Sequence, residues 1–182
     1  MKSIKFFKNA VACLFLVVSP VSTKFVFAHG DAHVHGLIRM DLAIDAKTLT
    51  VQIEAPLDSL LGFEHRPRTS AQKQAAETML KQMNNVNALI QPAKAAACKS
   101  TRVNVQSTVL QSPKPAGSKE AEHADLEASF EFLCEHPEKL TVIELGFFDE
   151  FKRVQKIEVQ VAGAKGQSKQ TLRRPNKVLR LN

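Results

Sequence analysis

The sequence predicts a single α+β domain, built mainly from an antiparallel β-sheet of about seven strands with one main helix. Several segments after residue 33 alternate apolar and polar residues, which is typical of half-buried strands, and one segment alone has clear helical spacing. The strands also follow one another mostly without intervening helices, which favours antiparallel neighbours. Residues 29–182 have the length of one domain with its own core.

The first 28 residues are predicted to be a secretory signal peptide. Three lysines within the first eight residues precede an apolar run over residues 10–18, and Ala28 ends a cleavage motif. The apolar run is about half the length that a membrane-spanning helix needs. We therefore expect a periplasmic mature chain that begins at His29, with no membrane insertion after cleavage.

The first two strands are predicted to form a hairpin. Apolar residues occupy nearly every even position over residues 34–44 and the odd positions over residues 49–55, with a turn at 45–47. In this interpretation the polar face of the first strand carries His33 and His35. The hairpin should end at proline, and residues 57–68 are expected to form an irregular connection.

One amphipathic helix is expected after this connection. Thr69 or Ser70 is a suitable N-cap, and good helix formers continue to about Asn84. Apolar residues recur at spacings of three and four, so one face should pack on the core. Pro92 rules out a longer helix.

The remaining chain is predicted to be mostly strands. Residues 111–122 are rich in Pro, Lys, Gly and Ser and are expected to form an exposed loop. Residues 123–134 alternate most regularly and place His123 on the polar face. The other predicted strands cover residues 101–108, 140–145, 157–161, 170–173 and 178–181.

Cys98 and Cys134 are the two cysteines that remain after removal of the leader. In an oxidising compartment an isolated pair is expected to form a disulfide, which here would close a loop of about 36 residues. The alternative, two thiolate metal ligands, requires both cysteines to stay reduced.

Composition and motifs argue against two classes of function, nucleic-acid binding and catalysis. The chain has 25 basic and 18 acidic residues, but four lysines and no acidic residue precede His29, which leaves a net charge of about +3. With no Tyr or Trp for base stacking, we expect no nucleic-acid partner. Nor do we expect an enzyme, because the sequence has neither a G-x-S-x-G nor an H-E-x-x-H motif.

All six histidines follow the predicted leader, and four of them are candidate metal ligands. His33 and His35, two residues apart on one strand, would lie on the same side. If their strand lies near that of His123, three imidazoles could reach one ion, and His65 beside Glu64 could supply another. Imidazole suits zinc, copper and nickel, and three or four such ligands suit tetrahedral zinc.

Three short blocks resemble the ZrgA-like periplasmic zinc-binding proteins. They are His33-Val34-His35-Gly36, the block over residues 60–65 that ends in Gly-Phe-Glu-His, and the Glu-His-Ala-Asp-Leu-Glu-Ala block over residues 122–128. The resemblance covers essentially all of the predicted mature chain. It implies a zinc-binding protein that serves the components of a zinc-uptake transporter, with His33, His35, His65 and His123 at the matching positions. Asp125 or Glu64 would orient the imidazoles.

The chain departs from that family at one place. Family members often carry a stretch rich in His, Asp and Glu before the Glu-His-Ala-Asp block. The corresponding residues 111–122 are short here and contain Lys and Pro but no His. The resemblance therefore implies a folded zinc site, whereas a scavenging role for this loop is not expected.

Two other functions are compatible with the sequence. Cleavage after Ala28 would expose His29, whose amine and ring could chelate copper together with a second histidine. Alternatively, the histidines are incidental and the protein is a metal-free interaction module of the cell envelope.

Overall fold

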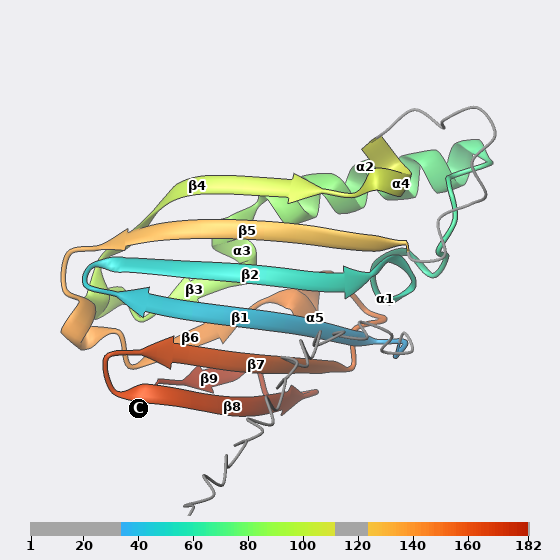
Figure 1. The fold of residues 1–182 in the computed structure, drawn as a ribbon. Coiled ribbons are helices and arrows are strands. Elements are labelled where there is room, and N and C mark those ends of the chain that lie inside the picture. Colours follow the sequence, from blue (N-terminus) through green and yellow to red (C-terminus); the bar gives the residue numbers. More distant parts are fainter. Residues whose placement is uncertain (1–33, 112–123, 182) are drawn as a thin grey trace, which may run out of the picture. The chain divides into compact units, whose positions relative to one another are not determined.

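The structure, a computed structural model, describes residues 34–111 and 124–181. These residues form nine strands, five short helices and two 3₁₀ turns (Figure 1). The predicted signal peptide, His29, His33 and His123 lie outside the described residues, as does the predicted loop apart from Gln111. The expected α+β class, with mostly antiparallel sheets, is confirmed within the described part of the chain.

Six strands form the larger sheet, in the order β4-β5-β2-β1-β7-β8. Their bounds are β1 Leu37–Asp45, β2 Thr48–Pro56, β4 Cys98–Gln106, β5 Asp125–Cys134, β7 Lys156–Gly163 and β8 Gly166–Arg173. All neighbours are antiparallel except β1 and β7, which are parallel. Consequently β1 and β5 begin at one end of the sheet, and β2 and β4 finish at that same end (Figure 1). We call this the entry end of the sheet.

A second layer covers one face of the larger sheet (Figure 1). It contains a smaller antiparallel sheet, β3-β6-β9, and helices α2, α3 and α5. The bounds are β3 Ile90–Pro92, β6 Val142–Leu145, β9 Val178–Arg180, α2 Ser70–Asn84, α3 Val86–Leu89 and α5 Phe147–Glu150. One hydrophobic core joins the layers; its largest fully buried side chains include Met40, Leu49, Met79, Phe130 and Phe147.

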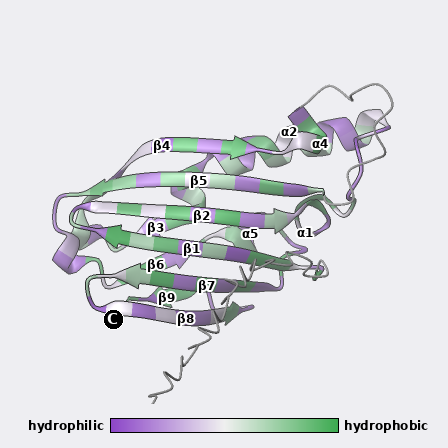
Figure 2. Ribbon diagram, in the orientation of Figure 1, coloured by the Kyte–Doolittle hydropathy of each residue, from purple (hydrophilic) through white to green (hydrophobic). Residues whose placement is uncertain are grey.

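The alternation predicted for the strands is present in the larger sheet. On β5, Leu126, Phe130 and Cys134 are buried, whereas Glu127 and Leu133 between them are exposed. Figure 2 shows the same alternation of hydrophilic and hydrophobic residues along the strands. The period of two therefore reflects a sheet that packs one face on the second layer and leaves its other, polar face open.

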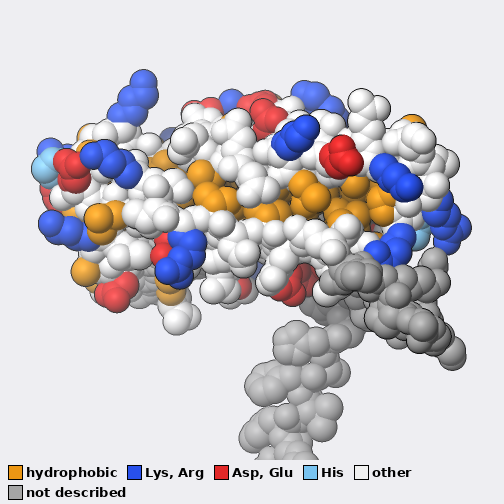
Figure 3. Space-filling view, turned by 90° about the horizontal axis from the view of Figure 1, so that it is seen from above, with side chains coloured by type: hydrophobic (Ala, Val, Ile, Leu, Met, Phe, Trp, Pro, Cys, Tyr) orange, Lys and Arg blue, Asp and Glu red, His pale blue; other side chains and the backbone are white. Residues whose placement is uncertain are grey.

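Helix α2 begins where the sequence predicts. The Thr69 side chain accepts a hydrogen bond from the Gln72 backbone, and the Gln72 side chain accepts one from the Thr69 backbone, forming a capping box. The helix buries Ala76, Met79 and Met83. Figure 3 views the molecule from the edge that carries β4 and α2, which is the upper edge in Figure 1. From this side a band of apolar side chains runs along the molecule, with polar side chains on both sides of it.

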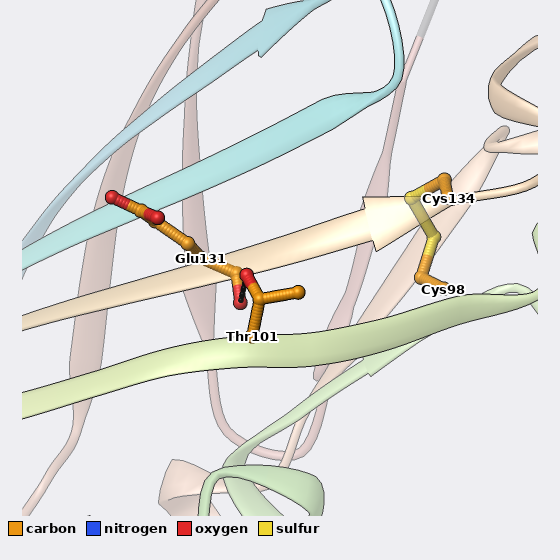
Figure 4. Close-up of a disulfide and its surroundings, with 4 residues drawn as sticks. All are labelled: Cys98, Thr101, Glu131 and Cys134. Atoms are coloured by element: carbon orange, nitrogen blue, oxygen red, sulfur yellow. Dashed lines mark hydrogen bonds between the residues drawn. A yellow bond between two sulfur atoms is a disulfide. The ribbon is translucent and has the colours of Figure 1, made fainter.

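The predicted disulfide between Cys98 and Cys134 is present. The two residues lie opposite each other at the start of β4 and the end of β5 (Figure 4). A bulge follows between Ser100 and Arg102, where the Thr101 hydroxyl donates to the Glu131 carbonyl. The disulfide thus closes the end of the sheet opposite to the entry end.

The prediction for the first strand was wrong at its start. β1 begins at Leu37 instead of residue 34, because Gly36 has a φ of +76° and the Leu37 N–H donates to the Val34 carbonyl in a turn. Val34, which was expected to face the core, is exposed. His35 therefore lies in the turn before the strand, and its placement on the polar face of the strand is wrong.

Several short elements were also not predicted. Part of the expected irregular connection forms α1 (Leu57–Leu61), which ends at Gly62 in the left-handed region. Helices α3, α4 (Thr108–Gln111) and α5 were missed. Strand β3 was missed as well, and it is the ninth strand beside the eight segments that were predicted as strands. Elements of three to five residues contain too little sequence for a periodic signal.

Candidate metal site

Separate chain segments meet at the entry end of the larger sheet. The turn before β1 is joined to α1, because the Gly36 N–H donates to the Ser59 hydroxyl at 3.0 Å. The start of β5 is joined to α1 as well, since the Leu57 N–H donates to the Ala124 carbonyl at 2.8 Å. Because the strand directions alternate, β1 and β5, on either side of β2, both begin at this end.

His35 lies in the turn before β1 and projects largely into solvent. Its side chain is 70% exposed, and Nδ1 lies 3.4 Å from the Oδ2 atom of Asp58 on α1. The carboxylate is therefore an acceptor placed beside this ring nitrogen. With Nδ1 directed at Asp58, the Nε2 atom is the nitrogen left to bind a metal ion.

His65 follows α1 and is half-buried. Its Nδ1 lies 2.8 Å from the Arg66 carbonyl oxygen. Because a carbonyl oxygen only accepts, this contact requires the proton on Nδ1, and in the neutral ring Nε2 then carries the lone pair. The ring of Phe63 stacks on the imidazole at 5.2 Å between centroids, which restricts its rotation. The Arg66 side chain donates to the Thr108 carbonyl at 3.4 Å, which links this segment to the residues that follow β4.

The two described candidate histidines therefore share one chemical arrangement. In each, an oxygen acceptor lies beside Nδ1 and Nε2 is left for a ligand. This is the arrangement of many metal-binding histidines, in which the acceptor fixes the tautomer and the ring orientation. Such nitrogens suit zinc, copper or nickel.

Two residues at the site were not identified from the sequence. Asp58 is only 11% exposed, and both its carboxylate oxygens lie near Arg153 Nη2, at 3.0 and 3.3 Å. Arg153 Nε also donates to the Asp58 carbonyl at 2.8 Å. The sequence signal for Asp58 was an acidic residue between apolar Leu57 and Leu60, but its partner lies 95 residues away. Only the fold reveals that contact.

A complete ligand set is not present within the described residues. Residues 34–111 and 124–181 contain no group of three or more His, Cys, Asp or Glu side chains arranged to hold a metal ion. His35 and His65 lie in these ranges, whereas His33 and His123 do not. Cys98 and Cys134 are joined to each other, so in this oxidised form neither offers a thiolate.

The other features with a possible binding role lie elsewhere. His136 is an exposed residue after β5, 3.7 Å from Glu138, at the opposite end of that strand from the entry end. A groove on the open face of the larger sheet is lined mainly by polar side chains, and neither His35 nor His65, the two candidate ligands that the structure describes, contributes to it. Its polar lining comes from Asp41, Thr50, Gln52, Gln160, Gln167, Ser168 and Lys169.

Comparison with protein families gives the context for this arrangement. A family model described as ZrgA family zinc uptake protein matches residues 32–181 of the 182-residue chain. The chain belongs to the ZrgA family. Its function is thus related to zinc uptake, and the predicted membership of the family is confirmed. A search of curated protein sequences found no match to the chain.

The ZrgA match includes the whole described domain, with both the entry end and the disulfide. Within that part of the chain, no helix combines the length and the apolar character that crossing a bilayer requires.

Proposed function

We propose that this ZrgA family protein is a periplasmic zinc carrier or accessory of a zinc-uptake system, and that it binds zinc through His33, His35, His65 and His123. The zinc ion is its cargo. Family membership supports the link to zinc uptake, and the disulfide is compatible with an oxidising compartment.

One observation carries the proposal: the segments next to all four histidines meet at the entry end. His35 belongs to the turn that is hydrogen-bonded to α1, and His65 follows α1 in the chain. His33 and His123 immediately precede Val34 and Ala124, and the Ala124 carbonyl accepts from α1. The described neighbours of the four histidines thus lie at one end of the sheet, which supports a shared site.

The chemistry of the candidate ligands agrees with reversible zinc binding. Three or four imidazoles satisfy the tetrahedral preference of zinc, and a water molecule or an outside ligand can complete a three-nitrogen set. Only neutral imidazole binds the metal, so zinc affinity should fall as the pH drops below about 6.5. A site close to solvent, as the exposed His35 indicates, would also allow transfer of the ion to a transporter component.

Metal analysis with a competitive chelator titration tests the proposal. The mature protein is purified from the periplasm without a histidine tag and compared with a variant in which His35, His65 and His123 are all changed to Ala. His136→Ala is the matched control, because it removes an exposed imidazole at the other end of β5.

We expect about one tightly bound zinc per chain in the wild type and in the control, and a loss of at least about 100-fold in affinity in the triple variant. Wild-type protein without bound metal and without micromolar affinity would contradict the proposal. So would a triple variant that binds zinc as tightly as the wild type.

A further inference from the structure

We propose that Asp58 is the positioning residue that directs Nε2 of His35 toward the metal ion, and that Arg153 holds the Asp58 carboxylate in place. This inference rests on the proposed zinc site and deepens it. Neither Asp58 nor Arg153 is suggested as a ligand.

The main chain around His35 is already fixed, so the side chain is the part that needs orientation. The Gly36 N–H is bound by Ser59, which is fully buried. The Gly36 carbonyl accepts from the N–H groups of Gln155 and Lys156 at 2.8 and 3.0 Å. The imidazole itself is 70% exposed and therefore has little packing to restrict its rotation.

Asp58 is the side chain that can supply this restraint. Its Oδ2 atom lies 3.4 Å from Nδ1 of His35, and an ionised carboxylate accepts but does not donate. The contact therefore favours the tautomer with the proton on Nδ1 and the lone pair on Nε2. When a metal ion binds Nε2, the Nδ1 proton becomes more acidic and its attraction to the carboxylate increases.

Arg153 keeps this carboxylate from turning away. Its Nη2 atom lies 3.0 and 3.3 Å from the two carboxylate oxygens, while its Nε donates to the Asp58 carbonyl. The same carbonyl accepts from the Gly62 N–H at 2.9 Å, at the end of α1. One guanidinium thus binds both the side chain and the backbone of Asp58, and its positive charge compensates a carboxylate that is nearly buried.

The first test measures zinc affinity in a double-mutant cycle of Asp58→Asn and His35→Ala. Glu54→Gln is the matched control, since it removes one negative charge from an exposed position near the end of β2. We expect Asp58→Asn to weaken zinc binding about 10–100-fold, and the control to change it by less than about 3-fold. In the His35→Ala background, Asp58→Asn should have no further effect, because it acts through His35.

The second test does not require zinc. Long-range proton–nitrogen NMR on zinc-free full-length mature protein, above pH 7.5, identifies which ring nitrogen of His35 carries the proton. We expect Nδ1 to be protonated in the wild type, with a shift toward Nε2 in Asp58→Asn. If Asp58→Asn does not fold, as judged by circular dichroism, the protonated ring nitrogen of His35 in the wild-type NMR spectrum decides whether the inference holds.

Failure of this inference and failure of the proposed function give different results. Wild-type protein that binds no zinc contradicts the proposed function. Zinc binding by the wild type, with Asp58→Asn no weaker than Glu54→Gln, contradicts the role of Asp58 alone. A wild-type His35 protonated on Nε2 also overturns it, as does an equal effect of Asp58→Asn in both backgrounds, which would show that Asp58 acts independently of His35.

Discussion

His35 and His65 direct Nδ1 toward an oxygen by different means. For His65 the acceptor is the next backbone carbonyl, so the contact is local in sequence. For His35 the acceptor is a side chain 23 positions later, and that side chain depends in turn on Arg153. The sequence identified both histidines from their residue type and spacing, but it could not identify an acceptor created by tertiary contacts.

The Arg153–Asp58 pair should stabilise the fold more than an exposed ion pair does. We expect Arg153→Ala to lower the free energy of unfolding by about 1–2 kcal/mol, because it leaves a nearly buried carboxylate without its cation. The loss should be modest because the Arg153 side chain is 53% exposed, where solvent screens its charge. Urea unfolding measures the change.

Arg102→Ala is the control for this prediction. Arg102 contacts Glu131 at 3.0 Å on the open face, where its side chain is 69% exposed, so its removal should cost under about 1 kcal/mol. Equal losses in the two variants would contradict a special role for the Asp58 carboxylate.

At the scale of single elements, the bounds that depend on local sequence were predicted well, whereas the bounds that depend on tertiary contacts were not. Helix α2 has its capping box and its 3.6-residue spacing within one stretch of sequence, so its bounds followed from that stretch. The start of β1 was misplaced because apolar Val34 and Gly36 continue the period of two into a turn. The tertiary hydrogen bonds of Gly36, to Ser59 and to the N–H groups of Gln155 and Lys156, hold this turn, and no local pattern reports them.

Gly36→Ala tests the close approach at this turn. An added Cβ would lie 3.0 Å from the Arg153 carbonyl oxygen, in addition to the strain of a positive φ. Gly166→Ala is matched for positive φ but has open space around its Cβ position. We expect Gly166→Ala to cost about 1–2 kcal/mol and Gly36→Ala about 1–3 kcal/mol more.

Thermal or urea unfolding compares the two variants, and chelator titration compares their zinc affinity. Gly36→Ala should also weaken zinc binding because it displaces His35, whereas Gly166→Ala should not. Equal stability and unchanged affinity in both would show that the turn does not position His35.

Strand β7 carries an ion pair whose contribution to stability depends on pH. The Lys156 ammonium donates to Glu158 at 2.8 Å and is the main cause of the lowered pKa of that carboxyl, despite its partial burial. Because the pKa is lower in the folded state, the pair stabilises the fold at neutral pH, and this contribution disappears as the pH falls through the folded-state pKa.

Glu158→Gln isolates this contribution. We expect it to lower the free energy of unfolding by less than about 1 kcal/mol at pH 7, and to have a smaller effect near pH 3. Urea unfolding at both pH values measures the difference. A difference that grows as the pH falls would contradict the sign of the pKa shift.

At the scale of the whole molecule, the sheet order separates the disulfide from the candidate metal site. β4 starts and β5 ends at the disulfide, whereas the segments of His35 and His65 lie at the entry end. The sequence predicted the β1–β2 hairpin, which is present, but not the order of the other strands. The antiparallel pair β2–β5 and the parallel pair β1–β7 depend on long-range pairing that period-two patterns do not encode.

Removal of the disulfide tests this separation. The double substitution Cys98→Ser and Cys134→Ser should lower the free energy of unfolding by about 2–4 kcal/mol, given the loop of 36 residues. Zinc affinity, measured well below the unfolding temperature, should stay within about 3-fold of the wild type. Loss of zinc binding by a variant that remains folded would indicate cysteine ligands instead.

X-ray absorption at the zinc edge tests the central claim most directly, because it reports the atoms around the bound ion. For mature protein loaded with one equivalent of zinc, the histidine site predicts three or four light-atom ligands at about 2.0–2.1 Å, with the scattering pattern of imidazole rings. The triple histidine variant should lose that pattern. A wild-type spectrum with sulfur near about 2.3 Å, or without imidazole scattering, would contradict the account.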